Sequence, residues 1–338
     1  MTRREWLRDA GLLVAGLGTS AMRGWGRARS GANLAHSSDR STAGSTWRCR
    51  FELSVITDEI SQDFGHCLEL AAKEFGLGFV EIRTLWQKNV VRLEPKELDE
   101  ARRLLDKYQL KVTDIASPLF KVDWPGAPKS KYAPAEAYGD AGFTFGQQDE
   151  VLERAIEAGK KLGTNRVRCF DFWRLDDPKE YRNTIDDRLR TAAGKAGKQG
   201  AVLLLENEYA CNTATGAEAA RTLAAVPSPH FLLNWDPGNA AFRGEVAYPD
   251  GYAELPKDRI GHMHLKDVQR KPDGNFEWAC MGRGLIDYGG QFRTLLKDGY
   301  SGTMSLETHW HGAGSPEESS RQSMAGTKEL LRKAGAAS

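Results

Sequence analysis

The stretch Phe231-Leu-Leu-Asn-Trp-Asp-Pro-Gly-Asn239 decides the fold and the chemistry that we predict for this chain. Its apolar run 231–233 is typical of a buried strand, and Pro237-Gly238 predicts a turn directly afterwards. Asp236 therefore falls at the carboxyl end of a buried strand. Packing does not require a carboxylate at such a place, because an unpaired Asp is costly to bury. We infer that Asp236 serves chemistry.

Three other strand-like runs deliver residues of a similar kind at their carboxyl ends: 201–205 with Glu206, 260–264 with His264, and 302–306 with Glu307. Carboxylate oxygens and imidazole nitrogens are common ligands of divalent ions in proteins. A single strand-end carboxylate is more often a salt-bridged structural group. Four such residues, each at a strand end, predict one divalent-metal site.

Strand-like and helix-like segments alternate along the whole chain. The expected strands are 51–56, 78–83, 111–116, 166–170, 201–205, 231–233, 260–264 and 302–306. The expected helices are 64–75, 95–108, 149–162, 181–198, 215–225, 287–297 and 316–334. This alternation predicts an α/β protein with parallel strands, and eight repeats fit a closed (β/α)8 TIM barrel. An open doubly wound sheet would need a Gly-rich first turn, and no G-x-G-x-x-G follows the first strand.

Three segments between the predicted elements stand out. The stretch after Asp236 is expected to be poor in helix, and 267–284 is expected to be a loop. The segment 119–148 combines three prolines with several aromatic residues and shows neither helical nor strand periodicity. A long aromatic loop inside a compact domain is usually a lid or a binding loop. The alternative is a peripheral segment or a contact between subunits, and the sequence leaves homo-oligomerisation open.

The amino terminus predicts export. Paired arginines in Thr2-Arg-Arg-Glu-Trp-Leu7 precede a weakly apolar, glycine-rich run, 10–22, which resembles a twin-arginine signal. That run is too short for a comfortable membrane span, so we expect no stable span after processing. We assign residues 1–48 to a signal peptide and linker and residues 49–338 to the barrel, and we expect a periplasmic or exported protein. A basic unstructured tail is the alternative.

The amino-acid composition argues against some kinds of partner and some kinds of site. The 338 residues carry 47 Lys and Arg against 46 Asp and Glu, so no net field favours nucleic acid as a partner. The five cysteines are scattered and form no C-x-x-C pair. This pattern argues against a disulfide framework and against a thiolate zinc site.

The predicted metal site permits proton-transfer chemistry. Glu206 and Glu307 follow the fifth and eighth strands and are expected on opposite sides of the barrel mouth. A metal ion between them can polarise a carbonyl and a hydroxyl of a substrate. Each glutamate could then exchange a proton with the neighbouring carbon, one from each face. This arrangement suits isomerisation or epimerisation of a hydroxy-ketone or sugar through an enediolate.

The sequence resembles the xylose isomerase-like TIM barrel superfamily, in its sugar phosphate isomerase/epimerase branch. The resemblance covers residues 50–335 and is carried by the motifs Val80-Glu-Ile-Arg83, Leu204-Leu-Glu-Asn207, Asn234-Trp-Asp-Pro-Gly-Asn239, His262-Met-His-Leu-Lys-Asp267, Gly282-Arg-Gly284 with Asp287, and Leu306-Glu307. The run His-x-His-x-Lys-Asp is the most specific of these motifs.

The resemblance implies roles for individual residues. It makes Glu206, Asp236, His264 and Glu307 the ligands of one divalent ion, usually manganese, magnesium, cobalt or zinc, with Glu206 and Glu307 as the acid/base pair. The substrate would be a sugar or a keto-sugar. The residues expected to bind it are Glu81, Asn239, His262, Lys266 and Arg270. Asn239 stands where ketose epimerases of this group often carry a His, and His262 would alternatively support the metal site from the layer below.

Three other functions compete with the isomerase prediction. Endonucleases that cut abasic DNA use the same barrel with three zinc ions, but Asn239 and His262 replace two of their expected ligands. A lyase that cleaves 3-keto-glycosides by β-elimination would use the same metal and the same base, and an exported location suits it. A non-catalytic sugar-binding protein is the third alternative, although all four predicted ligands are retained.

Overall fold

Eight parallel strands form a ring in the part of the chain that the structure describes. The computed structural model describes residues 47–137, 139 and 141–338. The strands are β1 (Glu52–Val55), β2 (Phe79–Ile82), β5 (Lys111–Leu119), β6 (Arg166–Cys169), β7 (Val202–Glu206), β8 (Phe231–Trp235), β9 (Ile260–Leu265) and β12 (Thr303–Leu306). They pair in the order β1-β12-β9-β8-β7-β6-β5-β2, and a parallel bridge from Ile56 to Glu81 joins the two ends. The predicted barrel and all eight predicted strands are confirmed.

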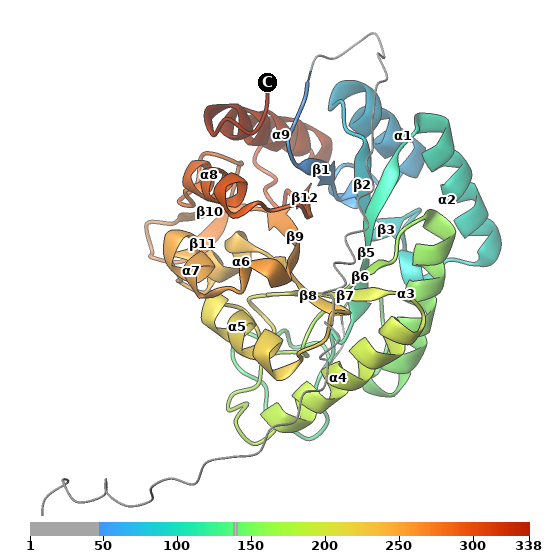
Figure 1. The fold of residues 1–338 in the computed structure, drawn as a ribbon, viewed down its shortest axis with the longest axis vertical. Coiled ribbons are helices and arrows are strands. Elements are labelled where there is room, and N and C mark those ends of the chain that lie inside the picture. Colours follow the sequence, from blue (N-terminus) through green and yellow to red (C-terminus); the bar gives the residue numbers. More distant parts are fainter. Residues whose placement is uncertain (1–46, 138, 140) are drawn as a thin grey trace, which may run out of the picture. The chain divides into compact units, whose positions relative to one another are not determined.

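Helices lie outside the ring of strands (Figure 1). They are α1 (Phe64–Glu69), α2 (Pro95–Tyr108), α3 (Gln148–Leu162), α4 (Arg182–Lys198), α5 (Gly216–Ala225), α6 (Pro237–Phe242), α7 (Tyr252–Glu254), α8 (Tyr288–Asp298) and α9 (Pro316–Lys333). The seven predicted helices are confirmed, and a further helical turn, Leu70–Glu74, prolongs α1. Their starts follow capping chemistry: Glu94 and Glu97 form a capping box on α2, and Thr215 and Glu218 form one on α5.

The inside of the barrel is polar to an unusual degree. Barrel interiors are commonly filled by Val, Ile and Leu. Here the buried side chains that meet between strands include Ser54, Glu81, His262, His264 and Ser305. The hydroxyls of Ser54 and Ser305 lie 2.5 Å apart, and Glu81 of β2 reaches both histidines of β9 across the ring. The apolar residues of the strands face the helices instead, so the hydrophobic core lies between the strands and the helices.

Two predicted loops contain regular structure. Pro237 starts α6 rather than a turn, with Asp236 as its N-cap: the Asp236 carboxylate accepts a hydrogen bond from the backbone N–H of Asn239 at 2.8 Å. The expectation of a helix-poor stretch was wrong here, because Asp followed by Pro also suits the first two positions of a helix. The segment 267–284 was predicted as a loop, but β10 (Asp267–Arg270) and β11 (Phe276–Ala279) pair in it as an antiparallel hairpin.

The segment 119–148 packs against its own barrel. Trp124 makes an edge-to-face contact with Phe172, and the guanidinium of Arg243 on α6 lies 3.6 Å above the Tyr132 ring. Its last residues form a short 3-10 helix, Phe145–Gln147, before α3. The segment 119–148 is therefore packed against the rest of the domain. Its predicted role as a lid stays a prediction.

The predicted export signal lies outside the described residues, apart from Trp47 and Arg48. Among the described residues, no helix combines the length and the apolar character that crossing a bilayer demands. All five cysteines are described, and all five are free. The prediction of a chain without a disulfide framework is confirmed for these residues.

Candidate active site

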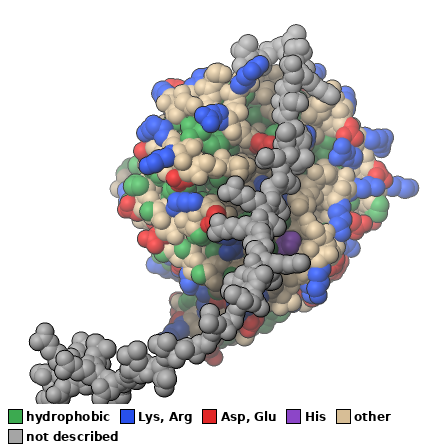
Figure 2. All heavy atoms as spheres, viewed as in Figure 1, with side chains coloured by type: hydrophobic (Ala, Val, Ile, Leu, Met, Phe, Trp, Pro, Cys, Tyr) green, Lys and Arg blue, Asp and Glu red, His purple; other side chains and the backbone are tan. Residues whose placement is uncertain are grey.

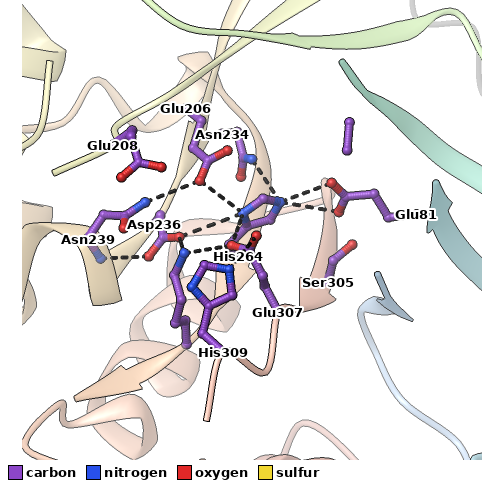
Figure 3. A network of polar contacts seen from close by, with 12 residues as sticks. Glu81, Glu206, Glu208, Asn234, Asp236, Asn239, His264, Ser305, Glu307 and His309 are labelled. Atoms are coloured by element: carbon purple, nitrogen blue, oxygen red, sulfur yellow. Dashed lines mark hydrogen bonds and ion pairs between the residues drawn. The ribbon is translucent and has the colours of Figure 1, made fainter. Parts of the chain in front are cut away.

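The four predicted ligands meet at one point inside the carboxyl-terminal end of the barrel. Glu206 is the last residue of β7, Asp236 and Glu307 directly follow β8 and β12, and His264 lies within β9. His264 Nδ1 is 3.4 Å from Glu206 Oε1, 3.6 Å from Asp236 Oδ2 and 3.2 Å from Glu307 Oε2. All four residues are buried. Figure 3 shows the three carboxylates converging on this one ring nitrogen.

The donor atoms of this cluster suit a divalent ion. Within the described part of the chain, His264 Nδ1 is buried and makes no hydrogen bond, although three carboxylates surround it. Buried polar atoms are usually hydrogen-bonded, so an imidazole nitrogen that faces three carboxylates in this way fits the binding of a cation. One potential donor atom from each of the four residues lies within 4.8 Å of the others. Three carboxylates and one imidazole form a donor set that binds magnesium, manganese, cobalt or zinc.

Glu81 fixes the orientation of His264. Its carboxylate lies 3.2 Å from His264 Nε2, on the side of the ring away from the cluster, and 3.1 Å from His262 Nε2. A carboxylate at one ring nitrogen holds the proton there and leaves the other nitrogen free for an ion. Glu81 and His262 are wholly buried beneath the cluster. The sequence predicts substrate binding for Glu81 and either substrate binding or support of the metal site for His262, and the buried positions of both suit support of the site.

Three cations contact the carboxylates of the cluster, Lys266 at oxygens that face His264 and Arg83 and Arg168 at oxygens on the other side. Lys266 Nζ donates to Glu307 Oε2 at 2.6 Å and lies 2.8 Å from Asp236 Oδ2. Arg83 Nη1 donates to Glu307 Oε1 at 2.8 Å, and Arg168 Nη1 lies 3.1 Å from Glu206 Oε2. Burial alone would raise the pKa of the Glu206 carboxyl, but attraction to His264 and Arg168 outweighs it and lowers this pKa to about 2.

The same balance acts on Glu307. Burial raises its pKa, but Lys266, His309 and His264 together bring the pKa well below the usual value of a glutamate. Both glutamates are therefore ionised at neutral pH. Ionised carboxylates are the form that can bind a cation or accept a proton.

A cavity of about 480 Å³ opens directly above the cluster. Its lining combines Glu206 and Glu307 with residues from the first half of the barrel and from the segment 119–148, which contributes Gly139 and Ala141. Small-molecule sites commonly have volumes in this range. The described residues therefore provide a space for a small substrate beside the two glutamates.

The other predicted substrate-binding residues lie in different places. Asn239 donates through Nδ2 to Glu206 Oε1 at 3.1 Å, and Lys266 is held by two carboxylates, so both touch the cluster. Arg270 is exposed on the β10–β11 hairpin, where its guanidinium stacks on the Phe276 ring at 4.6 Å. The structure brings Asn239 and Lys266 to the cluster and leaves Arg270 outside the cavity lining.

The sequence analysis missed several residues that line the cavity: Asp58, Arg83, Lys121, Arg168, Glu208 and His309. One signal was present for Arg83, which stands at the carboxyl end of a predicted strand like the four ligands, whereas Arg168 lies inside a strand. Lys121, Glu208 and His309 lie two or three residues beyond the last residue of a strand. No regular side-chain period applies there, so their direction could not be read from the sequence.

On the face that Figure 2 draws, the charged side chains do not form a large patch of one sign. Lys and Arg side chains are interspersed there with Asp and Glu side chains around the part drawn in colour. This agrees with the near-zero net charge of the sequence.

The chain is similar in sequence to carbohydrate epimerases and to a dehydratase. The L-ribulose-5-phosphate 3-epimerase UlaE of Escherichia coli strain SMS-3-5 is 23% identical over 268 residues, covering 71% of this chain and 90% of that protein. An inosose dehydratase of Bacillus licheniformis is 31% identical over 126 residues, covering 33% of this chain and 41% of that protein.

A solved structure shares the fold. The IOLI protein, determined with a bound zinc atom, superposes with a TM-score of 0.66 at 19% sequence identity, covering 83% of this chain and 98% of that one. The model of the family described as xylose isomerase-like TIM barrel matches residues 70–330. These residues include every strand from β5 to β12 and all four residues of the cluster. The chain belongs to the xylose isomerase-like TIM barrel family.

Proposed function

We propose that this protein is a metal-dependent isomerase or epimerase that moves a proton at a carbon next to the carbonyl of a keto-sugar. One observation carries the proposal. The carboxylates of Glu206 and Glu307 reach the same nitrogen of His264 from two sides, at 3.4 and 3.2 Å, and both line the same cavity. Two ionised carboxylates on either side of one bound substrate are what proton removal and return require.

Glu206, Asp236, His264 and Glu307 would hold the ion. When bound, a divalent ion polarises a carbonyl or hydroxyl oxygen and stabilises the negative charge that develops on it. The related solved structure with zinc supports an ion in this fold without identifying the metal for this chain. Glu81 would keep Nδ1 of His264 turned towards the ion through its contact with Nε2.

The side chains of the protein perform the proton transfer. One ionised glutamate takes the proton from the carbon next to the carbonyl. The resulting enediolate is reprotonated by that same glutamate, or by the other glutamate after it has taken a proton from solvent water. Arg83 and Lys266 hold Glu307 in place, while Arg168 and Asn239 hold Glu206. Because each carboxylate is held at two oxygens, its direction is set before substrate arrives, which favours the transfer.

A lyase is the second candidate, and His309 favours it. Its Nε2 lies 3.2 Å from Glu307 Oε1 and 3.5 Å from Glu59 Oε1, and its ring lines the cavity. β-Elimination from a 3-keto-glycoside needs a base for the carbon proton and an acid for the oxygen that leaves. Glu307 and His309 could supply these two roles side by side. The similarity to an inosose dehydratase also supports this candidate.

The test measures deuterium uptake from the solvent by candidate substrates in the presence of each of four metal ions. The full chain, supplied in turn with Mg²⁺, Mn²⁺, Co²⁺ or Zn²⁺, is incubated in D₂O with ketopentoses, ketohexoses and a 3-keto-glucoside, and NMR reports exchange at the carbon next to the carbonyl. We expect exchange with conserved substrate mass. Release of a second product would replace the isomerase by the lyase, and sugar binding without any exchange would indicate a non-catalytic binding protein.

A variant of one predicted metal ligand extends the same test. Asp236→Ala should reduce the metal content from about one ion per chain to less than about a tenth and abolish exchange, because it removes one of four ligands. Elemental analysis measures the content. Asp187→Ala, at an exposed position on α4, is the matched control and should change neither quantity. Unchanged metal content in Asp236→Ala would remove the proposed site.

A further inference from the structure

The geometry points to an uncharged carbohydrate, not a sugar phosphate, as the molecule that this cavity takes, with Lys121 and Glu208 binding its hydroxyl groups. This inference rests on the proposed function, for which it names the substrate class. It differs from what the similarity to a ribulose-phosphate epimerase would suggest. The observations that carry it are the partners of the cavity's cations and the Lys121–Glu208 pair.

Every Arg and Lys side chain in the described lining of the cavity is already paired with carboxylate. Arg83 contacts Asp58 at 2.9 Å, Glu59 at 2.6 Å and Glu307 at 2.8 Å. A second guanidinium, that of Arg168, contacts Glu206, and it also lies within hydrogen-bonding distance of the backbone carbonyls of Ala116 and Ser117. Neither guanidinium is free to bind a phosphate group in the forked geometry that arginine usually offers.

The carboxylates in the lining would repel an anion. Asp58, Glu206, Glu208 and Glu307 face the same cavity as the paired cations. A phosphate dianion would have to displace one of these carboxylates from its cation while staying close to the others. Like charges brought together in a partly buried site disfavour binding. A neutral ligand meets no such opposition.

Lys121 and Glu208 form a pair suited to hydroxyl groups. They follow β5 and β7, and Lys121 Nζ donates to Glu208 Oε2 at 3.0 Å. The ammonium also lies 4.6 Å from the centre of the Phe170 ring, which helps to fix it. An ammonium only donates hydrogen bonds and a carboxylate only accepts them. Because a hydroxyl does both, one hydroxyl or two neighbouring ones can satisfy the pair without breaking it.

The opposite wall offers neutral polar groups. Thr84, Gln87 and Asn89 line the cavity from the β3–β4 hairpin (Thr84–Leu85 and Lys88–Asn89). Its two-residue turn, Trp86 and Gln87, has φ of 53° and 62°, a conformation that usually requires Gly or Asn. Gln87 is held there by a hydrogen bond from its backbone N–H to Gln62 Oε1 at 3.0 Å. Amides and hydroxyls on this wall suit the other hydroxyls of a carbohydrate.

The test compares two probes that differ only in phosphate. Sorbitol and sorbitol 6-phosphate cannot undergo the proposed reaction, so calorimetric titration of the full chain with Mn²⁺ measures binding regardless of turnover. We expect sorbitol to bind at least about tenfold more tightly than its phosphate ester. Tighter binding of the ester, or binding of neither probe, would overturn the inference. Sorbitol binding, together with no deuterium exchange in any keto-sugar of the preceding test, would keep the substrate class and remove the isomerase.

A charge-specific variant separates recognition from structure. Glu208→Gln leaves Lys121 without its carboxylate, so we expect sorbitol to bind about tenfold more weakly and the phosphate ester about tenfold more tightly. A merely structural role of Glu208 would weaken both probes, and that result would contradict the inference. Glu329→Gln breaks a comparable pair with Lys333 on the exposed face of α9 and should leave both affinities unchanged.

Discussion

The carboxylates of the cluster and the arginines that pair with them come from two different sets of neighbouring strands. The strands β7, β8, β9 and β12 are neighbours in the ring and deliver the four residues of the cluster; we call them the acidic arc. The strands β2, β5 and β6 are also neighbours, and we call them the basic arc. Arg83 and Lys121 follow β2 and β5, and Arg168 lies within β6. The site lies where the two arcs face each other across the barrel.

Because the site lies between the two arcs, the two oxygens of each glutamate carboxylate face different partners. Glu206 turns Oε1 towards His264 and Oε2 towards Arg168. Glu307 turns Oε2 towards His264 and Oε1 towards Arg83. One oxygen of each glutamate thus faces His264 while the other is fixed by the basic arc. The oxygen that faces His264 is also held, by Asn239 in Glu206 and by Lys266 in Glu307. Charge pairing across the barrel lets two glutamates lie within reach of the same imidazole without an intolerable repulsion.

Removing a charge from the acidic arc should have the largest effect. Glu307→Gln keeps the shape of the side chain but cannot accept the proton, so we expect the rate of deuterium exchange to fall about a thousandfold. Metal content should fall as well, because an amide binds divalent ions more weakly than a carboxylate. NMR exchange rates and elemental analysis measure the two effects. An exchange rate within tenfold of the wild type would show that Glu307 is not the base.

Removing a cation from the basic arc should mainly affect stability. Arg83→Met leaves Asp58, Glu59 and Glu307 without their shared partner, and breaking such a buried network costs about 3 to 5 kcal/mol in the free energy of unfolding. Urea unfolding measures this loss in the free energy of unfolding. The exposed pair of Arg102 with Asp106 is the control, since Arg102→Met should cost less than about 1 kcal/mol. Equal losses in both variants would mean that the basic arc contributes no more than a surface ion pair.

The smallest effect is expected outside both arcs. Arg270 bonds only within its own hairpin among the contacts of the described residues, through the Phe276 ring and the carbonyl of Gly274 at 3.3 Å. Arg270→Ala should therefore change kcat/KM by less than about twofold, because an exposed arginine of this kind contributes little. Steady-state kinetics measures the change. A tenfold rise in KM would bring the hairpin into the substrate site, as the resemblance to ketose epimerases had implied.

The last residues of the motif His262-Met-His-Leu-Lys-Asp267 illustrate how one run of sequence serves two purposes. His264 and Lys266 take part in the cluster. Asp267 instead accepts hydrogen bonds from the backbone N–H groups of Val268, Gly282, Gly284 and Ile286. A Cβ at Gly284 would lie 2.2 Å from Asp267 Oδ1, which explains the glycine. The motif combines site residues with the group that ties down the following loop.

The sequence by itself determined the barrel and the meeting of Glu206, Asp236, His264 and Glu307. Alternating strands and helices imply parallel strands, and the carboxyl ends of parallel strands in a closed barrel lie on one face. Any residue at such an end is therefore brought to that face without knowledge of a single long-range contact. This is why four residues spread over a hundred positions could be grouped from their local patterns alone.

Only the tertiary structure decided what surrounds those four residues. The depth of Glu81 and His262 inside the barrel depends on the stagger between strands, which no local pattern shows. Lys121, Glu208 and His309 lie beyond their strands, where backbone turns rather than a side-chain period set the direction. The hairpin of β10 and β11 carries Arg270 away from the cavity. Strand pairing fixes position along the barrel axis and loop geometry fixes direction, and both are long-range properties of the folded chain.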